Sequence, residues 1–463
     1  MNHDREFLGS EPIGKLLFRL SLPTVAAQLI NMLYNIVDRI YIGHIPGVGA
    51  LALTGVGVCM PLIMIVSAFA ALVSSGGAPR ATISMGKKDY DYAESILGTC
   101  FLAQLVISAV LTVLLLSGNR AFLMAFGGSP DTIEYAVSYM NIYALGTVFV
   151  QLTLGMNAFI TAQGFAKTGM LSVLLGAVCN IVLDPILIFG FDMGVRGAAL
   201  ATVISQAVSC TWVLLFLTGK KTVLRIRPKK MRIRPSILFP CMALGLSFFI
   251  MQSSESVVSI CFNSSLQKYG GDIAVGAMTI LTSVMQFAML PLQGLGQGAQ
   301  PIISYNYGAR NTDRVRKTFW MLLRVSLFYS VLLWLLVMLL PRAFASLFAS
   351  DAALISFTAS ALRIYLASLC LFGIQIACQM TFTSIGSALM SIIVAVVRKF
   401  VLLLPMIYLM PRLLPANRTF AVYLAEPVTD FFAVCFTSVL FFFAFRKSLA
   451  KLEDRKKPES GAL

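Results

Sequence analysis

Four oxygen-bearing side chains interrupt apolar stretches in the first half of this chain: Asp38, Asn180, Asp184 and Thr202. Asn180 precedes Asp184 by four residues, so the two side chains share one face of a helix. An ionised carboxylate inside an apolar segment needs a partner, a cation or water. The set is therefore typical of a site that binds protons or sodium ions. The alternative for Asp38 is an interfacial residue paired with its neighbour Arg39.

The elements that must position these side chains are long and apolar. The chain is 58% hydrophobic and 12% charged, and its mean hydropathy is +0.84. About 20 apolar residues in a helix are enough to cross a bilayer. Twelve such stretches predict twelve transmembrane helices, at residues 16–42, 51–78, 93–117, 133–162, 168–190, 196–218, 237–266, 273–300, 316–340, 353–385, 389–410 and 419–445.

Counting along the first, fifth and sixth spans places the four side chains at one depth. At 1.5 Å per residue, the carboxylates of Asp38 and Asp184 lie roughly 6–9 Å below the outer boundary. Thr202, on the inward-running sixth span, is about six residues from the same boundary. Two prolines are candidate hinges, because Pro185 frees a backbone acceptor beside Asp184 and Pro23 predicts a kink in the first span.

The second half of the chain repeats motifs of the first. Four residues recur at the same displacement of 222 positions: Gly76, Pro79, Gly86 and Asp91 return as Gly298, Pro301, Gly308 and Asp313. Six spans per half is an even number, so both halves have the same orientation. We expect an all-α integral membrane protein of two pseudo-symmetric six-helix bundles. The expected parts are an N-terminal bundle (1–219), a basic linker (220–235), a C-terminal bundle (236–446) and a polar, disordered tail (447–463).

Basic residues predict the orientation in the membrane. Residues 220–234 contain eight Lys or Arg side chains and no acidic one. With the other loops included, sixteen basic residues against six place the linker, the tail and both termini in the cytoplasm. The net charge of +16 is explained by this orientation and requires no nucleic acid or other polyanion.

Other functional classes lack their motifs. The chain has no Walker sequence, no set of nucleophile and base, and nine cysteines without metal or disulfide spacing. We therefore expect no enzyme activity, no cofactor and no metal other than a sodium ion at Asp38, Asn180, Asp184 and Thr202. The first apolar stretch is too long for a cleavable signal peptide.

Over residues 8–446 the chain resembles the multidrug and toxic compound extrusion (MATE) family, in its bacterial branch. The motifs that carry the resemblance are Pro23 with Asn31 and Asp38, Asn180 with Asp184-Pro185, and the segments 76–79 and 298–301 that end in proline. The resemblance implies two six-helix bundles around a central cleft, in a monomer of the bacterial cytoplasmic membrane. It also implies export of lipophilic organic cations in exchange for protons or sodium ions.

The resemblance assigns residues as well. The family's first-bundle cation site falls on Asp38, Asn180, Asp184 and Thr202, and other polar positions of that bundle fall on Asn31, Tyr139 and Asn157. In the second half, Glu255, on one face with Gln252, matches an acidic position that some members use for coupling. Those members also have an acidic residue in span ten, where this chain has Gln375 and Gln379. A second-bundle ion site thus stays open, since Glu255 could equally be a structural partner of Arg398.

Two other functions fit the sequence less well. A flippase for lipid-linked saccharides, from the same superfamily, should have a cationic cleft for pyrophosphate, and the carboxylates of the first bundle disfavour it. An integral-membrane enzyme would need a catalytic motif, which the sequence lacks.

Overall fold

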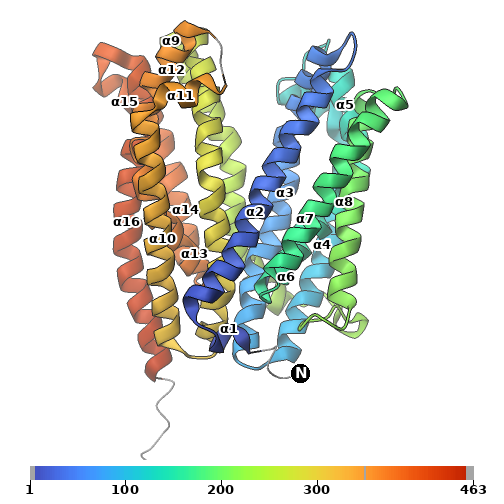
Figure 1. Cartoon of the computed structure of the whole chain (residues 1–463), viewed down its shortest axis with the longest axis vertical. Coiled ribbons are helices and arrows are strands. Elements are labelled where there is room, and N and C mark those ends of the chain that lie inside the picture. The colour runs from blue at the N-terminus through green and yellow to red at the C-terminus, as the bar shows by residue number, and fades with distance from the viewer. Residues whose placement is uncertain (1–5, 349–350, 455–463) are drawn as a thin grey trace, which may run out of the picture.

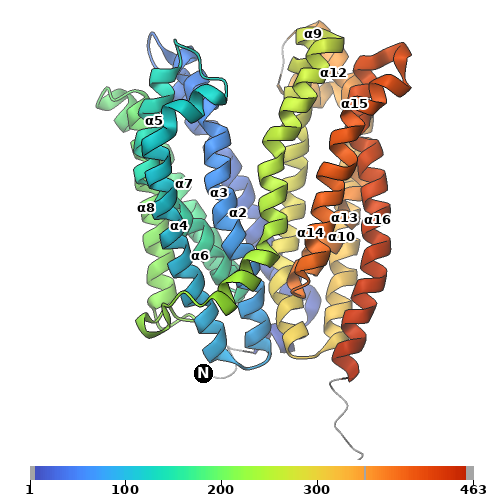
Figure 2. The ribbon, with the colours of Figure 1, turned by 180° about the vertical axis from the view of Figure 1, so that it is seen from behind.

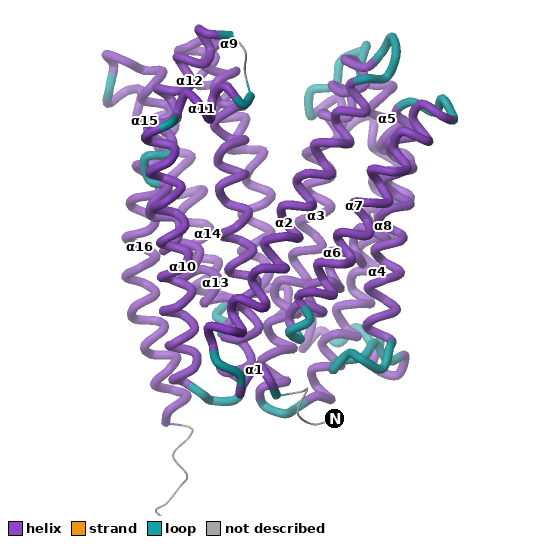
Figure 3. Tube along the Cα trace, in the orientation of Figure 1, coloured by secondary structure: helices purple, strands orange, loops and turns teal. Residues whose placement is uncertain are grey.

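The computed structural model describes residues 6–348 and 351–454. Figure 3 shows helices and loops throughout this part of the chain, with no strand. The first half contains α1 (Phe7–Ser10), α2 (Ile13–Gly43), α3 (Gly49–Gly86), α4 (Tyr90–Ala125), α5 (Ile133–Leu145), α6 (Thr147–Ala162), α7 (Ala166–Pro185), η2 (Ile186–Gly190) and α8 (Val195–Thr218). The second half contains η3 (Pro228–Lys230), α9 (Pro235–Gly308), α10 (Thr312–Leu339), α11 (Pro341–Ser346), α12 (Ala352–Tyr365), η4 (Leu369–Leu371), α13 (Phe372–Ser384), α14 (Ala388–Val396), η5 (Val397–Leu403), α15 (Leu404–Leu413), η6 (Pro415–Asn417) and α16 (Arg418–Asp454).

The long helices of the described residues have the length and apolar composition of membrane spans. Nine helices of the described residues are long and apolar enough to cross a membrane, or eleven if two bent pairs each form one span. The bent pairs are α5 with α6, at 57°, and α12 with the helix that follows it, at 42°. Helix α9 counts once although it has 74 residues and breaks at Gly271, where φ is 65°. The all-α membrane fold is confirmed, and the exact number of twelve stays a prediction.

The helices form two lobes, which we call the N-lobe (α2–α8) and the C-lobe (α9–α16). The lobes meet near α1 and diverge toward the end that carries α5, α11 and α12 (Figure 1). The linker from α8 to α9 and the C-terminal end of α16 both lie at the end where the lobes meet (Figure 2). The linker, the start of the described chain and its end therefore share one side of the molecule.

Equivalent contacts in the two lobes reproduce the sequence repeat. Thr82 donates a hydrogen bond to the carbonyl of Ala162 at 2.9 Å, and Ser304 donates one to the carbonyl of Ser384 at 2.8 Å. All four residues obey the displacement seen in the sequence. The same displacement relates the side chains that cap the N-termini of α4 and α10, which are Asp89 and Asn311.

The two halves touch backbone to backbone where α3 and α9 end. A Cβ atom at Gly86 would lie 2.0 Å from the carbonyl oxygen of Tyr305, and one at Gly308 would lie 2.0 Å from that of Ile83. Only glycine lets two backbones approach this closely. Ile83 and Tyr305 are themselves equivalent in the repeat, so each half makes the same contact on the other. This reciprocity is expected where a pseudo-twofold axis passes between two helices.

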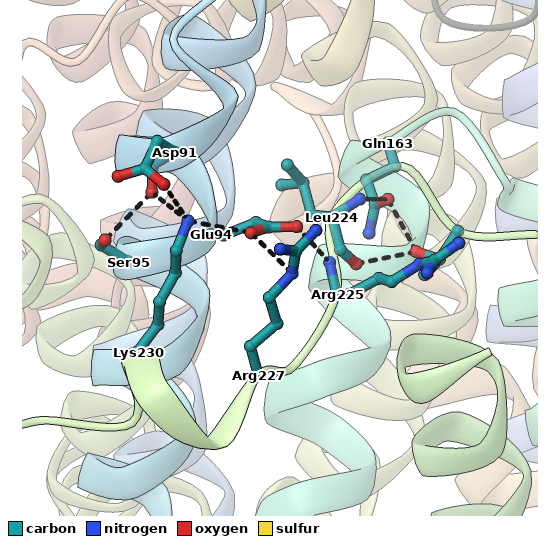
Figure 4. Close-up of polar contacts among 9 residues, drawn as sticks. Asp91, Glu94, Ser95, Gln163, Leu224, Arg225, Arg227 and Lys230 are labelled. Carbon is teal, nitrogen blue, oxygen red and sulfur yellow. Dashed lines mark hydrogen bonds and ion pairs between the residues drawn. The ribbon is translucent and has the colours of Figure 1, made fainter. Parts of the chain in front are cut away.

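The linker is bound to the N-lobe by polar contacts (Figure 4). Glu94 of α4 is almost fully buried and pairs with Lys230 Nζ at 2.9 Å and with Arg227 Nε at 3.1 Å. Lys230 also pairs with Asp91. Gln163 Oε1 accepts hydrogen bonds from two linker backbone N–H groups, at 2.9 and 2.7 Å. Burial opposes the charge of Lys230, but the hydrogen bonds and charges of Asp91 and Glu94 outweigh it and raise the pKa of Lys230.

The predicted tail begins later than residue 447. Residues 447–454 continue α16, because Leu449 and Leu452 are buried in the same core cluster as Phe441 and Phe445. That apolar spacing extends the packed face of the helix by two turns. The expectation of a disordered tail at 455–463 falls outside the described residues.

Candidate functional site

A buried polar cluster lies between α2, α7 and α8, and we call Asp38, Asn180, Asp184 and Thr202 the N-lobe acid cluster. The amide of Asn180 donates to Asp184 Oδ1 at 3.4 Å and to Thr202 Oγ1 at 3.5 Å. Asp184 is 0% exposed and Asn180 1%. Asp38 is also buried and lies beside Asp184, close enough for the two carboxylates to interact. The structure thus brings together the four side chains that depth counting had grouped.

Small residues allow α7 and α8 to hold these groups at close range. A Cβ at Gly176, one turn before Asn180, would lie 2.3 Å from Ser209 Oγ of α8. Ser209 also donates to the carbonyl of Ser172 on α7, at 2.8 Å. With the helices this close, Asn180 reaches Thr202 across their interface.

The cluster contains more acceptors than donors. Three of its oxygen atoms are buried and have no hydrogen-bond partner among the described residues: Asp38 Oδ1, Asn180 Oδ1 and Asp184 Oδ2. No ion pair joins Asp38 to Arg39 in this part of the chain, so the interfacial-pair alternative lacks its contact. Unpartnered carboxylate oxygens at a buried site favour a proton or a cation as the missing partner.

A cavity of about 40 Å³ adjoins the cluster. Asn31 and Tyr34 of α2 line it together with Asn180, Thr202 and Gln206. Tyr34 and Gln206 are not among the site residues predicted from the sequence, although helical spacing could have identified both. Tyr34 precedes Asp38 by four residues and Gln206 follows Thr202 by four, so each shares a helical face with a cluster member. The cavity has room for a few water molecules or one small ion, not for a drug-sized molecule.

Of the other N-lobe candidates, Tyr139 lies beside the cluster and Asn157 does not. Tyr139 of α5 is buried and lies close to both Asp38 and Thr202, so it belongs with the cluster. Asn157 of α6 donates to the carbonyl of Gly169 at 3.3 Å and does not line the cavity.

Both candidate hinge prolines lie inside or at the end of helices. Pro23 is buried within α2, and the adjacent Thr24 donates to the carbonyl of Gly294 on α9 at 2.6 Å. Pro185 ends α7, and the chain continues as the π-helical turn η2. Inserted π turns occur frequently at functional sites.

The second-half candidates occupy a different setting. Glu255 of α9 has 55% of its side chain exposed and pairs with Lys399 Nζ of η5 at 2.6 Å. Its direct partner is therefore Lys399, whereas Arg398 pairs with Asp430. Gln252, one turn before Glu255, is half-buried. Among the described residues, no group of three or more His, Cys, Asp or Glu side chains could hold a metal ion.

Two lobes of apolar helices with carboxylates buried between the helices have the architecture of a secondary transporter. Comparison with known proteins makes the assignment specific. The MatE family model matches residues 23–186 and 248–409, one segment in each half. The chain belongs to this family, which confirms the sequence-based recognition.

Relatives and solved structures agree with the family. The multidrug export protein MepA of Staphylococcus haemolyticus (strain JCSC1435) is 27% identical over 366 residues, which is 78% of this chain and 79% of that protein. MepA of Staphylococcus aureus (strain N315) is 25% identical over 371 residues, covering 80% and 81%. A crystal structure of MATE in the bent conformation matches with a TM-score of 0.89 and 23% identity over 98% of each chain. An outward-facing multidrug resistance MATE transporter matches with a TM-score of 0.87 and 23% identity, over 97% of this chain and 98% of its own. At this identity the structural matches establish the fold.

Proposed function

We propose that this protein is a secondary antiporter that exports lipophilic organic cations in exchange for protons or sodium ions. The observation that carries the proposal is the N-lobe acid cluster, in which two carboxylates lie side by side and each keeps a buried oxygen without a donor. The name of the MepA relatives, multidrug export protein, supports the same function.

The chemistry of coupling follows from the two carboxylates. Two negative charges in a poorly hydrated pocket repel each other, and a bound cation relieves that repulsion. A proton would neutralise Asp38 or Asp184. A sodium ion would sit between them and accept further oxygens from Asn180 and Thr202. Both ions fit the site, so the proposal leaves the choice to the experiment.

Export requires the ion to favour one conformation of the lobes. An ion shifts a conformational equilibrium only if it binds one state more tightly. Because Asp38 and Pro23 lie on the same helix, occupancy at Asp38 can bias a kink at Pro23, where α2 contacts α9. In the outward-facing state the protein would take up the ion and release the drug, and in the inward-facing state it would do the reverse. We place the drug between the lobes, in a monomer of the bacterial cytoplasmic membrane.

The test is transport in proteoliposomes with the pH and sodium gradients clamped separately and tetraphenylphosphonium as the organic cation. Asp184→Asn keeps the shape of the side chain and removes its charge, so it should abolish ion-driven export at normal expression. Asp38→Asn should behave alike, and the double variant should be little worse than either single one, since both groups serve one site. Asp131→Asn, in an exposed loop, is the matched control. Wild-type rates for Asp184→Asn under a fixed gradient would show that coupling occurs elsewhere, with Glu255 the next candidate.

A further inference from the structure

The C-lobe holds a second group of buried charges that the proposed coupling does not use. Its members are Glu255 on α9, Arg398 and Lys399 on the π-helical η5, and Glu426 and Asp430 on α16. We call them the C-lobe charge cluster. All except Glu255 are buried. The cluster contains three carboxylates and two cations, so it is one positive charge short if every group is ionised.

Two of the carboxylates have full partners. Asp430 Oδ1 accepts hydrogen bonds from Arg398 Nε at 3.1 Å and pairs with Nη2 at 3.0 Å, while Ser368 donates to Oδ2 at 3.0 Å. Glu255 pairs with Lys399 at 2.6 Å. The guanidinium of Arg398 also lies 5.0 Å from the ring centre of Phe372, which fixes its orientation toward α16.

Glu426 is the carboxylate that remains. Its side chain is 6% exposed, and its one ion pair is to Arg398 Nη2 at 3.8 Å, beyond hydrogen-bond length. Within the described residues no side chain donates a hydrogen bond to it at normal length. Glu426 also lies four residues before Asp430, so two acidic groups share one helical face, where like charges repel.

The two cations near Glu426 attract its charge, but each has a closer carboxylate partner. The charged and titratable groups that face Glu426 are Glu255 of α9, Tyr365 of α12, Arg398 and Lys399 of η5, and Asp430 of α16. Each cation already pairs with another carboxylate at 3.1 Å or less. A third buried negative charge would therefore have to share cations that already pair more closely with other carboxylates, which is costly.

We propose that Glu426 holds a proton in the resting protein, which makes the C-lobe charge cluster electrically balanced. A proton needs one carboxylate oxygen and no cage of ligands, whereas a metal ion needs several oxygens around it. The site is separate from the N-lobe acid cluster and does not depend on the proposed antiport. It gives the C-lobe a proton-binding carboxyl group of its own.

Infrared spectroscopy of the purified full-length protein tests this directly. The background is the Asp38→Asn/Asp184→Asn variant, in which the two carboxyls of the N-lobe acid cluster are absent. The spectrum of this variant at neutral pH should contain the C=O stretch of a protonated carboxylic acid. Adding Glu426→Gln should remove that band, and adding Glu134→Gln instead, at an exposed ion pair outside the cluster, should leave it. Absence of the band from the background variant would overturn the proposal, and so would its persistence after Glu426→Gln.

Thermal stability provides a second test, because it distinguishes a protonated Glu426 from an ionised Glu426 that pairs with Arg398. Gln has nearly the shape of a protonated Glu, so Glu426→Gln should leave the melting temperature in detergent unchanged or raise it. Asp430→Asn is the matched variant one turn away, and it should lower the melting temperature because Arg398 loses its ionised partner. A drop for Glu426→Gln as large as that for Asp430→Asn would mean that Glu426 is ionised and would contradict the proposal.

Discussion

At the scale of single residues, the balance of donors and acceptors distinguishes the N-lobe acid cluster from ordinary buried polar groups. The amide N–H groups of Asn180 donate to Asp184 Oδ1 and Thr202 Oγ1. Asp38 Oδ1 and Asp184 Oδ2 therefore have no donor among the described residues. Gln206, on the wall of the adjoining cavity, adds one more buried oxygen without a donor. Four buried oxygens without a donor, on Asp38, Asn180, Asp184 and Gln206, are therefore available to a cation in this region.

This arrangement predicts a role for Gln206. Gln206→Leu removes an oxygen acceptor beside the cluster without adding charge, so the coupling ion should bind more weakly, by a factor on the order of 10. The concentration dependence of ion-driven export, measured at constant drug concentration, reports this affinity. Thr211→Ala, on an exposed face of the same helix, should leave it unchanged. Equal affinities for wild type and Gln206→Leu would exclude Gln206 from the ion path.

The N-lobe cluster could be predicted from the sequence because its determinants are local. The rise of a helix fixes the depth of a residue, and spacing by four fixes its face. The partner of Glu255 could not be predicted in this way. Arg398 and Lys399 lie in a π-helical segment, where the change in helical register gives neighbouring side chains directions that α-helical counting misses.

At the scale of elements, the linker makes contacts that its basic sequence pattern does not predict. A run of basic residues indicates topology, but here Lys230 and Arg227 also bind Glu94 and fasten the linker to α4 (Figure 4). These contacts join segments more than 130 residues apart, so no local signal encodes them. The linker should therefore move with the N-lobe.

Removal of the buried acid should release the linker. Glu94→Gln deletes the charge that holds Lys230 and Arg227, so a spin label at position 229, in a cysteine-free background, should become more mobile. The matched control is Glu134→Gln, which breaks an exposed pair with Arg120 in another part of the N-lobe. An exposed pair contributes little, so label mobility should not change in that variant. Equal mobility in both variants would show that Glu94 does not hold the linker.

The same contact has a predictable pH dependence. The pKa of Lys230 is raised above its ordinary value of 10.5, so the contact contributes fully below that value and is lost only as pH rises through the higher value of the folded protein. Label mobility at position 229 should stay constant between about pH 6 and pH 9 and increase only above the ordinary lysine value. An increase within that neutral range would assign the contact to another group.

The crossing of α3 and α9 makes a prediction about stability. Gly86→Ala forces a Cβ into the backbone of Tyr305, so it should destabilise the protein by about 1–3 kcal/mol or more. Gly57→Ala, in the same helix but with nothing within 4 Å of the new Cβ, should be neutral or slightly stabilising. Melting temperatures of the two variants in detergent, followed by size-exclusion chromatography, measure the difference. Equal melting temperatures would mean that the helices separate at little cost.

At the scale of the whole molecule, the orientation in the membrane stays a prediction. The linker and the ends of the described chain share one side, and the basic residues favour the cytoplasm for it (Figure 2). In a cysteine-free background, Lys229→Cys should not react with an impermeant reagent added to intact cells. Asp131→Cys, in the loop between α4 and α5, should react. Strong labelling at position 229 would reverse the assignment.

The two-lobe plan could be predicted from the sequence. The bends within the bundles and the contacts of the linker could not, and only the structure shows them. The repeat is a sequence property that requires no knowledge of contacts, whereas the 57° bend between α5 and α6 and the 42° bend after α12 were not predicted from the sequence. Both halves fold alike where their equivalent side chains make equivalent hydrogen bonds, as at Thr82 and Ser304.

The reciprocal contact of Gly86 and Gly308 also bears on how two copies of a duplicated segment can diverge. Elsewhere the two halves need not match, and their buried acidic residues differ: Asp38, Glu94 and Asp184 in the N-lobe, and Glu426 and Asp430 in the C-lobe. At the crossing, each glycine is required by the backbone of the opposite copy, and no compensating side-chain change can make room against a main-chain carbonyl. Both positions therefore have to remain glycine for the two helices to keep this contact. An insertion that shifted either helix by one residue would have to be matched in the other copy before the lobes could meet again.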